Sequence, residues 1–491
     1  MSTGDFSFSF AMPAPSPAPR CIARPFQARP IGQETLILAA DSEISTRAPM
    51  FYAQMLAHCD RLRTLEAHAD SVIRHFGLPP DQRAAVQQGL KGLLERGLLQ
   101  DEQSVYQTLN RDSTLDDVEQ PALRLLCVRT CDRPGDLVQL LGSLSRRIEN
   151  TSLARVLVLD DSRTPQAVAA NARAVSETAL ARHAELLHID RARRASLIAQ
   201  LSTEAGVSRP ALHWLIEGDD DDSAASYGAS LNLALLLSAG ERFLMIDDDA
   251  LIDPYALSAP QDRLSRRVAR STRETQIASS VALMTTTMTG IDNRELLLPV
   301  PAKGRGEDLV FGAGIRYLYP GTPCAALPWM LPHRLQSRRR WTAEDLAQKQ
   351  GAGLAAYLAE RMEDLTEATG VTDSDARVGL LAAWMASLGK MHDKERLNDL
   401  RRHLLDRRAR TADAVSKTLA QLNPPDWLRK EFEVIISGHL QIDAADTQRM
   451  ATQAPAIGRF ASAYGKALPH WSTAWRYVAR NGCNPLLTGI A

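Results

Sequence analysis

Cysteine and long apolar runs are both scarce in this sequence of 491 residues. Its cysteines have neither the dense spacing of a secreted disulfide scaffold nor the paired C-x-x-C motifs of zinc sites. The longest uncharged apolar stretches, at 231–240 and 378–389, are shorter than the roughly 18 to 20 residues that span a bilayer. The N-terminus has no basic segment followed by an apolar one, as a signal peptide would. We therefore expect a cytoplasmic protein with free thiols and no integral membrane segment.

An excess of charge of one sign is also missing, because the formal net charge at pH 7 is -1. A nearly neutral chain gives no overall signal for binding nucleic acid or a charged membrane surface. The helix-like segment at 83–96 offers only Arg83, Lys91 and Arg96 to phosphates, which is few for a nucleic-acid binder. We expect no nucleic-acid partner, and any charge-driven function has to be local.

The chain is long enough for several domains, and four regions differ in composition and in hydrophobic pattern. Residues 1–45 are rich in Pro, Ala, Ser and Phe without a period, which predicts a disordered tail. Residues 46–118 predict two short helices, and their ending "LLERGLLQDE" is similar to the close of a winged-helix recognition helix, so we expect a small winged-helix-like module. Residues 119–340 alternate between strand-like and helix-like patterns, which predicts an α/β domain. Residues 341–491 predict an α-helical accessory domain.

Within 119–340, polar motifs follow apolar runs that read as strands. "LRLLCV" precedes "TCDRP", a helix is predicted over 136–147, and "RVLVLDDS" begins about thirty residues after the first strand, which is the spacing of a βαβ unit. A helix predicted over 228–238 leads into the strand "RFLMI" and then into "DDDA". Because ligands of open parallel sheets collect at the carboxyl ends of the strands, these three endings predict one site.

The third ending places Asp247, Asp248 and Asp249 side by side. Like charges at that spacing repel, and a bound cation would relieve the repulsion. Oxygen ligands of this kind suit Mg²⁺ or Mn²⁺, which predicts a metal site. The alternative is a solvated turn or helix cap, which is how we interpret the still more acidic "EGDDDDS" at 217–223, because no apolar strand leads into it.

The order of these motifs resembles the GT-A class of nucleotide-sugar glycosyltransferases, particularly the inverting family 2, over residues 122–335. The resemblance implies that the loop with Thr130, Asp132 and Arg133 borders the nucleobase. It also implies that Asp161, next to Asp160, accepts the N3-H of uracil, a donor that cytosine lacks. The aspartate trio then binds ribose and metal, with Asp249 as the principal ligand and Asp247 on ribose or metal. Asp248 belongs to the same donor-binding motif, and its side chain is expected to point back into the fold.

Three further segments extend the resemblance. Gly228 and Asn232 match a helix that precedes the metal motif in this family, although Leu231 stands where an Arg is common. We therefore expect Arg193 or Arg194 to hold the diphosphate instead. "KGRGEDLVFGAG" matches the segment with the catalytic base, which predicts Asp308 as the base and Glu307 as the second choice. In "LPWMLPHR", His333 matches a late histidine ligand of the metal.

Together these patterns predict a GT-A, Rossmann-like central domain between a winged-helix-like module and an all-α domain. The expected reaction is hexosyltransferase-like: metal-dependent, inverting transfer from a UDP-sugar, with Mn²⁺ or Mg²⁺. The N-terminal module is similar to peptide-recognition domains of enzymes that modify ribosomal peptides, which implies a peptide or protein acceptor. The alternative acceptor is a growing glycan of a surface polysaccharide or lipopolysaccharide. Two alternatives belong to other functional classes: a nucleotidyltransferase, and a DNA-binding regulator with a degenerate enzyme domain.

Overall fold

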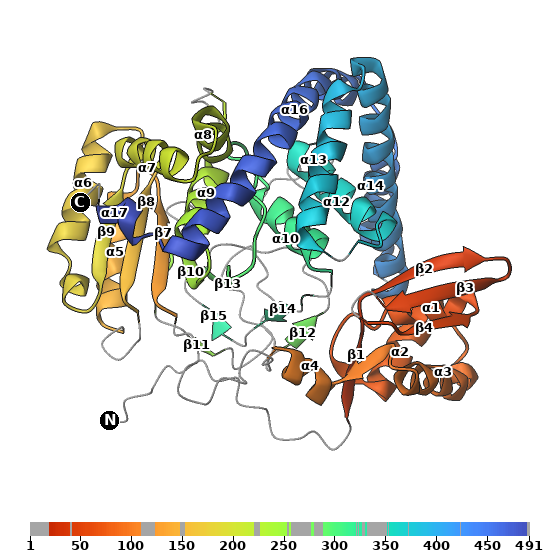
Figure 1. Cartoon of the computed structure of the whole chain (residues 1–491). Helices are drawn as coiled ribbons and strands as arrows, with labels where there is room; N and C mark the ends of the chain where they lie inside the picture. The colour runs from red at the N-terminus through yellow and green to blue at the C-terminus, as the bar shows by residue number, and fades with distance from the viewer. Residues whose placement is uncertain are drawn as a thin grey trace.

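The computed structural model describes most of the chain as a mixed α/β protein (Figure 1). The described residues are 19–39, 42–109, 123–147, 153–219, 226–252, 255–256, 276–278, 288–320, 322, 324–326, 329–330, 351, 353–371, 373–422 and 424–488. A five-stranded sheet flanked by helices leads into a largely helical C-terminal region. Among the described helices, none combines the length and the apolar character that crossing a membrane requires.

The N-terminal region has two small antiparallel sheets and its own buried core. The elements are β1 (Arg20–Ala23), β2 (Phe26–Ile31), β3 (Glu34–Ala39), β4 (Ser45–Ala48), α1 (Met50–Ala57), β5 (Arg63–Thr64), α2 (Leu65–Phe76), α3 (Arg83–Glu95), β6 (Leu99–Asp101) and α4 (Glu102–Leu109). The sheet orders are β5-β1-β6 and β2-β3-β4. The two predicted helices are present as α2 and α3. Gly97, in the left-handed conformation at φ 74°, follows α3 as its sequence indicated.

The predicted disordered tail needs correction, because residues 20–39 form strands. Along β3, the side chains of Thr35, Ile37 and Ala39 are buried and alternate with more exposed residues. This period of two is what a strand with one buried face requires. The alternation is short and is surrounded by proline-rich sequence, so composition alone favoured disorder.

The central sheet has the strand order β13-β10-β7-β8-β9. Its strands are β7 (Leu125–Thr130), β8 (Arg155–Asp160), β9 (Glu185–Ile189), β10 (Arg242–Asp247) and β13 (Met288–Asp292). β10, β7, β8 and β9 are parallel, and β13 is antiparallel to β10. The predicted βαβ unit is thus confirmed. From β7 the chain proceeds to β8 and β9 on one side and returns to β10 on the other, so a topological switch point lies between β7 and β10.

Helices cover both faces of this sheet, which explains the unbroken apolar runs of β7 and β8. Leu126 and Val128 pack with α5 (Pro134–Ser145) and α6 (Pro165–Glu177). Leu125 and Cys127 face the opposite side and belong to the cluster that contains α7 (Arg191–Glu204), α8 (Arg209–Glu217) and α9 (Tyr227–Leu237). The short pairs β11 (Tyr255–Ala256) with β15 (Trp329–Met330), and β12 (Gln276–Ala278) with β14 (Cys324–Ala326), lie outside the main sheet.

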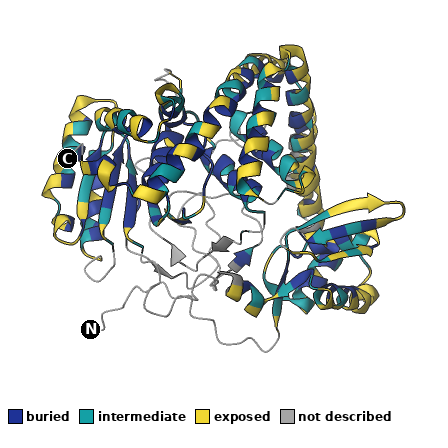
Figure 2. Cartoon of the chain, viewed as in Figure 1, coloured by how far each residue is buried: buried dark blue, intermediate teal, exposed yellow. Residues whose placement is uncertain are grey.

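α10 (Glu307–Leu318) and the helices after it share a buried core with the sheet, so the regions predicted as 119–340 and 341–491 pack against each other. The helices after α10 are α12 (Leu354–Ala368), α13 (Ser374–Lys390), α14 (Asp393–Leu422), α15 (Asp426–His439), α16 (Ala444–Asn481) and α17 (Asn484–Thr488). α16 runs from the helical region back to the sheet (Figure 1). Its buried Trp471 donates from Nε1 to the Leu297 carbonyl at 2.8 Å, and the Tyr464 hydroxyl donates to the Pro299 carbonyl at 2.6 Å. Buried residues therefore continue from the sheet into these helices (Figure 2).

A buried ion pair joins α14 to α16. Arg408 donates from Nη1 and Nη2 to the two carboxylate oxygens of Asp446 at 2.7 and 2.8 Å, and both side chains are 0% exposed. Hydrogen bonds from Arg408, with a further one from Arg449, hold the pKa of Asp446 far below its usual value. The two helices are thus joined by a paired charge that is removed from water.

Candidate active site at the switch point

Asp247, the last residue of β10, is held by an arginine from the neighbouring strand. Arg129, near the end of β7, donates from Nε and Nη2 to Oδ1 of Asp247 at 2.8 and 2.5 Å. Its third nitrogen, Nη1, is buried, has no hydrogen-bond partner among the described residues, and lies 3.7 Å from Oε1 of Glu307. Arg129 therefore links the aspartate trio to the first turn of α10. The sequence interpretation missed it, although a charge inside an apolar strand was the available signal.

The other two aspartates share one guanidinium group. Arg133 donates from Nη1 to Oδ2 of Asp249 at 3.0 Å and to Oδ1 of Asp248 at 3.4 Å. The Thr130 hydroxyl donates to Oδ2 of Asp248 at 2.8 Å. Asp248 is 4% exposed, and its burial raises its pKa to about 6. The loop after β7 and the trio after β10 are thus in direct contact, as the strand-end argument predicted.

The two aspartates after β8 have different surroundings. Asp160 is 0% exposed and accepts hydrogen bonds from His188 Nε2 at 2.8 Å, Asn171 Nδ2 at 3.0 Å and the Ser162 N-H at 2.9 Å. Burial alone would raise its pKa, but these hydrogen bonds outweigh burial and the pKa is lowered. The structure places Asp160 inside the protein, so its predicted contact with a donor is not favoured by this geometry.

Asp161 contacts two arginines, Arg191 and Arg194, in the first turn of α7. Its Oδ1 accepts hydrogen bonds from Arg194 Nη2 at 2.8 Å and Arg191 Nε at 3.2 Å, while the described residues donate no hydrogen bond to Oδ2. Arg194 is 1% exposed and also contacts Glu217. Arg193 donates to the His188 carbonyl at 2.7 Å. Both arginines predicted to hold the diphosphate are therefore engaged within the protein, and Arg194 orients Asp161.

Asp132 ties the β7 loop to the β8 loop. It has φ 53°, the left-handed region in which Asp is tolerated better than most residues. Its N-H donates to the Ser162 hydroxyl at 2.8 Å, and its Oδ1 accepts from the Arg163 N-H at 3.1 Å. These contacts fix the separation of the two loops, which is a structural role for a residue predicted to border the nucleobase.

Asn232 and Gly228 of α9 contact residues 300–302, which precede Glu307 in the chain. Asn232 is 0% exposed, donates from Nδ2 to the carbonyls of Leu215 and Val300 at 2.6 and 2.8 Å, and accepts from the Val300 N-H at 2.8 Å. A Cβ on Gly228 would lie 2.0 Å from the Pro301 carbonyl oxygen, so only glycine fits there. For Asn232 to contact a ligand, as predicted, these bonds would have to break.

Asn232→Leu is expected to destabilise the protein by about 2–3 kcal/mol, because it leaves the buried N-H of Val300 and two buried carbonyls without partners. Urea unfolding followed by circular dichroism measures this loss. Asn171→Leu, at another buried amide, gives a comparison outside this segment. A change below about 0.5 kcal/mol for Asn232→Leu would show that these bonds do not contribute.

Glu307 and Asp308 occupy the first turn of α10, and Glu307 lies next to Arg129, the arginine that holds Asp247. Glu307 is 9% exposed, faces Arg129, and accepts the Gly306 N-H at 3.1 Å. Burial, followed by the charge of Asp308, raises the pKa of Glu307 above its usual value. A buried carboxylate with a raised pKa is suited to accept a proton, which favours Glu307 over the predicted Asp308.

The predicted metal site is described only in part, because His333 lies outside the described residues. Within the described part of the chain, no three His, Cys, Asp or Glu side chains are grouped closely enough to hold a metal ion. Asp247 and Asp249 still fit Mg²⁺ or Mn²⁺, since such ions commonly use one or two carboxylates plus phosphates and water. Arg129 donates to Oδ1 of Asp247, and Oδ2 receives no hydrogen bond from the described residues. At Asp249, the guanidinium of Arg133 shows that a positive charge can be accommodated.

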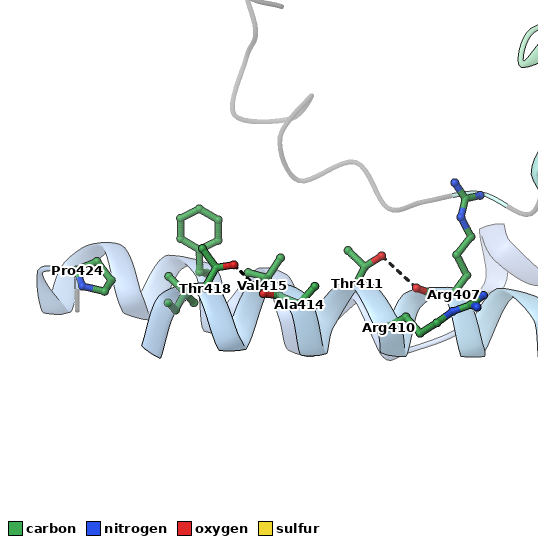
Figure 3. A pocket seen from close by; sticks show the side chains of 9 residues that line it. Arg407, Arg410, Thr411, Ala414, Val415, Thr418 and Pro424 are labelled. Carbon is green, nitrogen blue, oxygen red and sulfur yellow. Dashed lines mark hydrogen bonds between the residues drawn. The ribbon is translucent and has the colours of Figure 1, made fainter. Parts of the chain in front are cut away.

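A separate cavity of about 690 Å³ lies between α14 and α15 (Figure 3). Its lining is apolar at Val415, Leu419 and Phe432, and Arg407 and Arg410 stand at one end. Both arginines contact Glu360 of α12. Among its described lining residues, the two arginines are the ionisable ones, whereas carboxylates and arginines from different elements meet at the sheet edge. We therefore place the candidate active site at the switch point.

Comparison of this chain with protein-family models, with curated proteins and with solved structures gave no match.

Proposed function

We propose that this protein is a metal-dependent, inverting glycosyltransferase that transfers a hexose-like sugar from a UDP-sugar. The observation that carries the proposal is the meeting of three strand-end loops and Glu307 at the switch point of the sheet. Open α/β sheets bind ligands in the crevice at this position. At this edge of the sheet, Arg194 contacts Asp161, Arg129 contacts Asp247, and Arg133 contacts Asp249.

Donor recognition in this proposal uses Asp161. Arg191 and Arg194 hold its Oδ1, which leaves Oδ2 to accept the N3-H of a uracil ring. Cytosine presents no hydrogen at that position, so UDP should bind more tightly than CDP. The Arg194 contact to Glu217 fixes the guanidinium and, through it, the direction of the Asp161 carboxylate.

Asp247 and Asp249, with His333 as the ligand expected from the sequence, would hold the divalent ion. Such an ion, when bound, stabilises the negative charge that grows on a departing diphosphate. Arg129 keeps Asp247 in position through two hydrogen bonds to a single oxygen. Thr130 orients Asp248, which supports the loop between the two outer aspartates.

In the transfer step, the acceptor oxygen forms a bond to the anomeric carbon as the bond from that carbon to the β-phosphate oxygen breaks. The electron pair of the broken bond leaves with UDP, and the acceptor proton passes to a carboxylate. We assign that carboxylate to Glu307, because it is buried, has a raised pKa, and lies beside Arg129. A single displacement inverts the anomeric centre.

A peptide or protein is the proposed acceptor, and the N-terminal module supports this choice. Among the described strands, β4 (Ser45–Ala48) is at the edge of the sheet β2-β3-β4 and pairs with β3. Edge strands can pair with an extended peptide through main-chain hydrogen bonds. The module would then hold the acceptor while the switch-point site performs the transfer.

Thermal unfolding in the presence of UDP-glucose, UDP-N-acetylglucosamine and CDP-glucose, with and without Mn²⁺, tests the proposal. A UDP-sugar at 100 times its dissociation constant should add about 2.7 kcal/mol of stability, and CDP-glucose should add less. Asp161→Asn should remove the preference for UDP. Equal stabilisation by UDP- and CDP-sugars would overturn the role of Asp161, and no stabilisation by any of them would overturn the donor class.

A further inference from the structure

Among the described residues, Arg129 and Arg133 form ion pairs with the aspartate trio, and the two arginines differ in exposure and in hydrogen bonding. Arg129 is 11% exposed and gives two hydrogen bonds to Asp247. Arg133 is 41% exposed and reaches Asp248 and Asp249 through Nη1 alone. Arg129 is thus largely buried at the sheet edge, whereas the Arg133 side chain remains partly in contact with solvent.

The main chain at Arg133 is fixed, but its side chain has room to move. Arg133 is the residue before α5, followed by Pro134 at the first helical position. Proline restricts the backbone there, while a half-exposed arginine retains several rotatable bonds. The guanidinium can therefore leave Asp249 without any change in the fold.

Arg133 and a divalent ion would compete for the same carboxylate. A metal bound to either oxygen of Asp249 would lie next to the Arg133 guanidinium, which donates to Oδ2 at 3.0 Å, and the two cations would repel each other. A divalent ion at Asp249 would thus displace the guanidinium. A displaced arginine at this edge has a suitable new partner in the donor diphosphate, because its planar fork matches phosphate oxygens.

We propose that Arg133 is the resident counter-ion of Asp248 and Asp249, exchanging with the divalent ion and moving to the donor diphosphate when both bind. This rests on the proposed function. Its consequence is cooperative binding: the ion binds weakly alone because it must displace Arg133, and more tightly with UDP, to which Arg133 can then bind. Arg133 also limits occupation of the site by an ion without donor.

Mn²⁺ binding to the full chain, measured by electron paramagnetic resonance of the free ion, tests this inference. Without nucleotide, Arg133→Gln should bind Mn²⁺ about 2- to 5-fold more tightly than the unmodified protein, the range expected from loss of a partly exposed ion pair. In isothermal titration calorimetry with Mn²⁺ present, the same variant should bind UDP at least about tenfold more weakly. The factor by which UDP tightens Mn²⁺ binding should therefore fall.

Arg173→Gln is the matched control, because it removes the same charge from the exposed surface of α6. It should change neither measurement. Equal or weaker Mn²⁺ binding by Arg133→Gln, in the absence of nucleotide, would overturn the exchange and leave the metal site intact. Failure of Mn²⁺ to bind either protein, with or without UDP, would instead overturn the proposed metal dependence and the exchange with it.

Discussion

Glu307→Gln is expected to lower kcat by about 10²- to 10⁴-fold while leaving the dissociation constant of UDP nearly unchanged. Glutamine has the size of glutamate and can still accept the Gly306 N-H, but it cannot take a proton from the acceptor. The comparison of kcat with the Kd of UDP from calorimetry separates loss of chemistry from loss of donor binding. A structural role alone would disturb both.

Asp308→Asn is the matched control, because it changes the adjacent carboxylate in the same helical turn. The raised pKa of Glu307 adds a second readout. Glu307 can act as a base only in its ionised form. Because its pKa is raised, it becomes protonated at a higher pH than an ordinary glutamate, and the rate should begin to fall at that higher pH. If Asp308→Asn abolishes turnover and Glu307→Gln does not, the base is Asp308, as the sequence pattern predicted.

Asp446→Ala is expected to destabilise the protein by about 3–5 kcal/mol, because it leaves the Arg408 guanidinium buried without its carboxylate. The pKa of Asp446 is lowered in the folded protein, so the pair contributes stability at pH values above the ordinary pKa of an aspartate. That contribution is lost as the pH falls below the ordinary value and through the folded value. Urea unfolding at pH 7 and at acidic pH measures both effects.

The exposed pair Asp413 and Lys417, separated by 2.8 Å on α14, provides the control for this substitution. Asp413→Ala should cost less than about 1 kcal/mol, since exposed ion pairs contribute little. Replacing Arg408 and Asp446 together by methionine and leucine should cost far less than Asp446→Ala, because no charge is left buried. If Asp446→Ala is as stable as Asp413→Ala, the buried pair contributes no more to stability than the exposed pair, which would contradict this prediction.

The strands that carry the candidate site could be predicted from the sequence, because local patterns determine them. β7, β8 and β10 are apolar runs that end in polar residues, and parallel strands of one sheet place those ends at a common edge. The contact between Arg133 and the trio follows from this geometry. What could not be predicted is which polar side chains point to the edge and which point inward, as Asp160 does.

Contacts between distant parts of the chain account for the remaining differences. Trp471 meets the Leu297 carbonyl across 174 residues, and Asn232 meets Val300 across 68. The sequence predicted helices over 341–491, but not the surface that α16 covers. Likewise, Arg129 is one charge in an apolar strand, and only the approach of β10 and α10 gives it partners.

Trp471, Tyr464 and Trp475 of α16 all donate hydrogen bonds to the segment 293–299, which continues through Val300 to Glu307. If heat or proteolysis detached α16, residues 293–300 would lose these hydrogen bonds, and the position of Glu307 would no longer be fixed. Calorimetry should consequently record one joint melting event for sheet and C-terminal helices. A protease-trimmed fragment lacking α16 would be expected to aggregate rather than survive as a smaller enzyme.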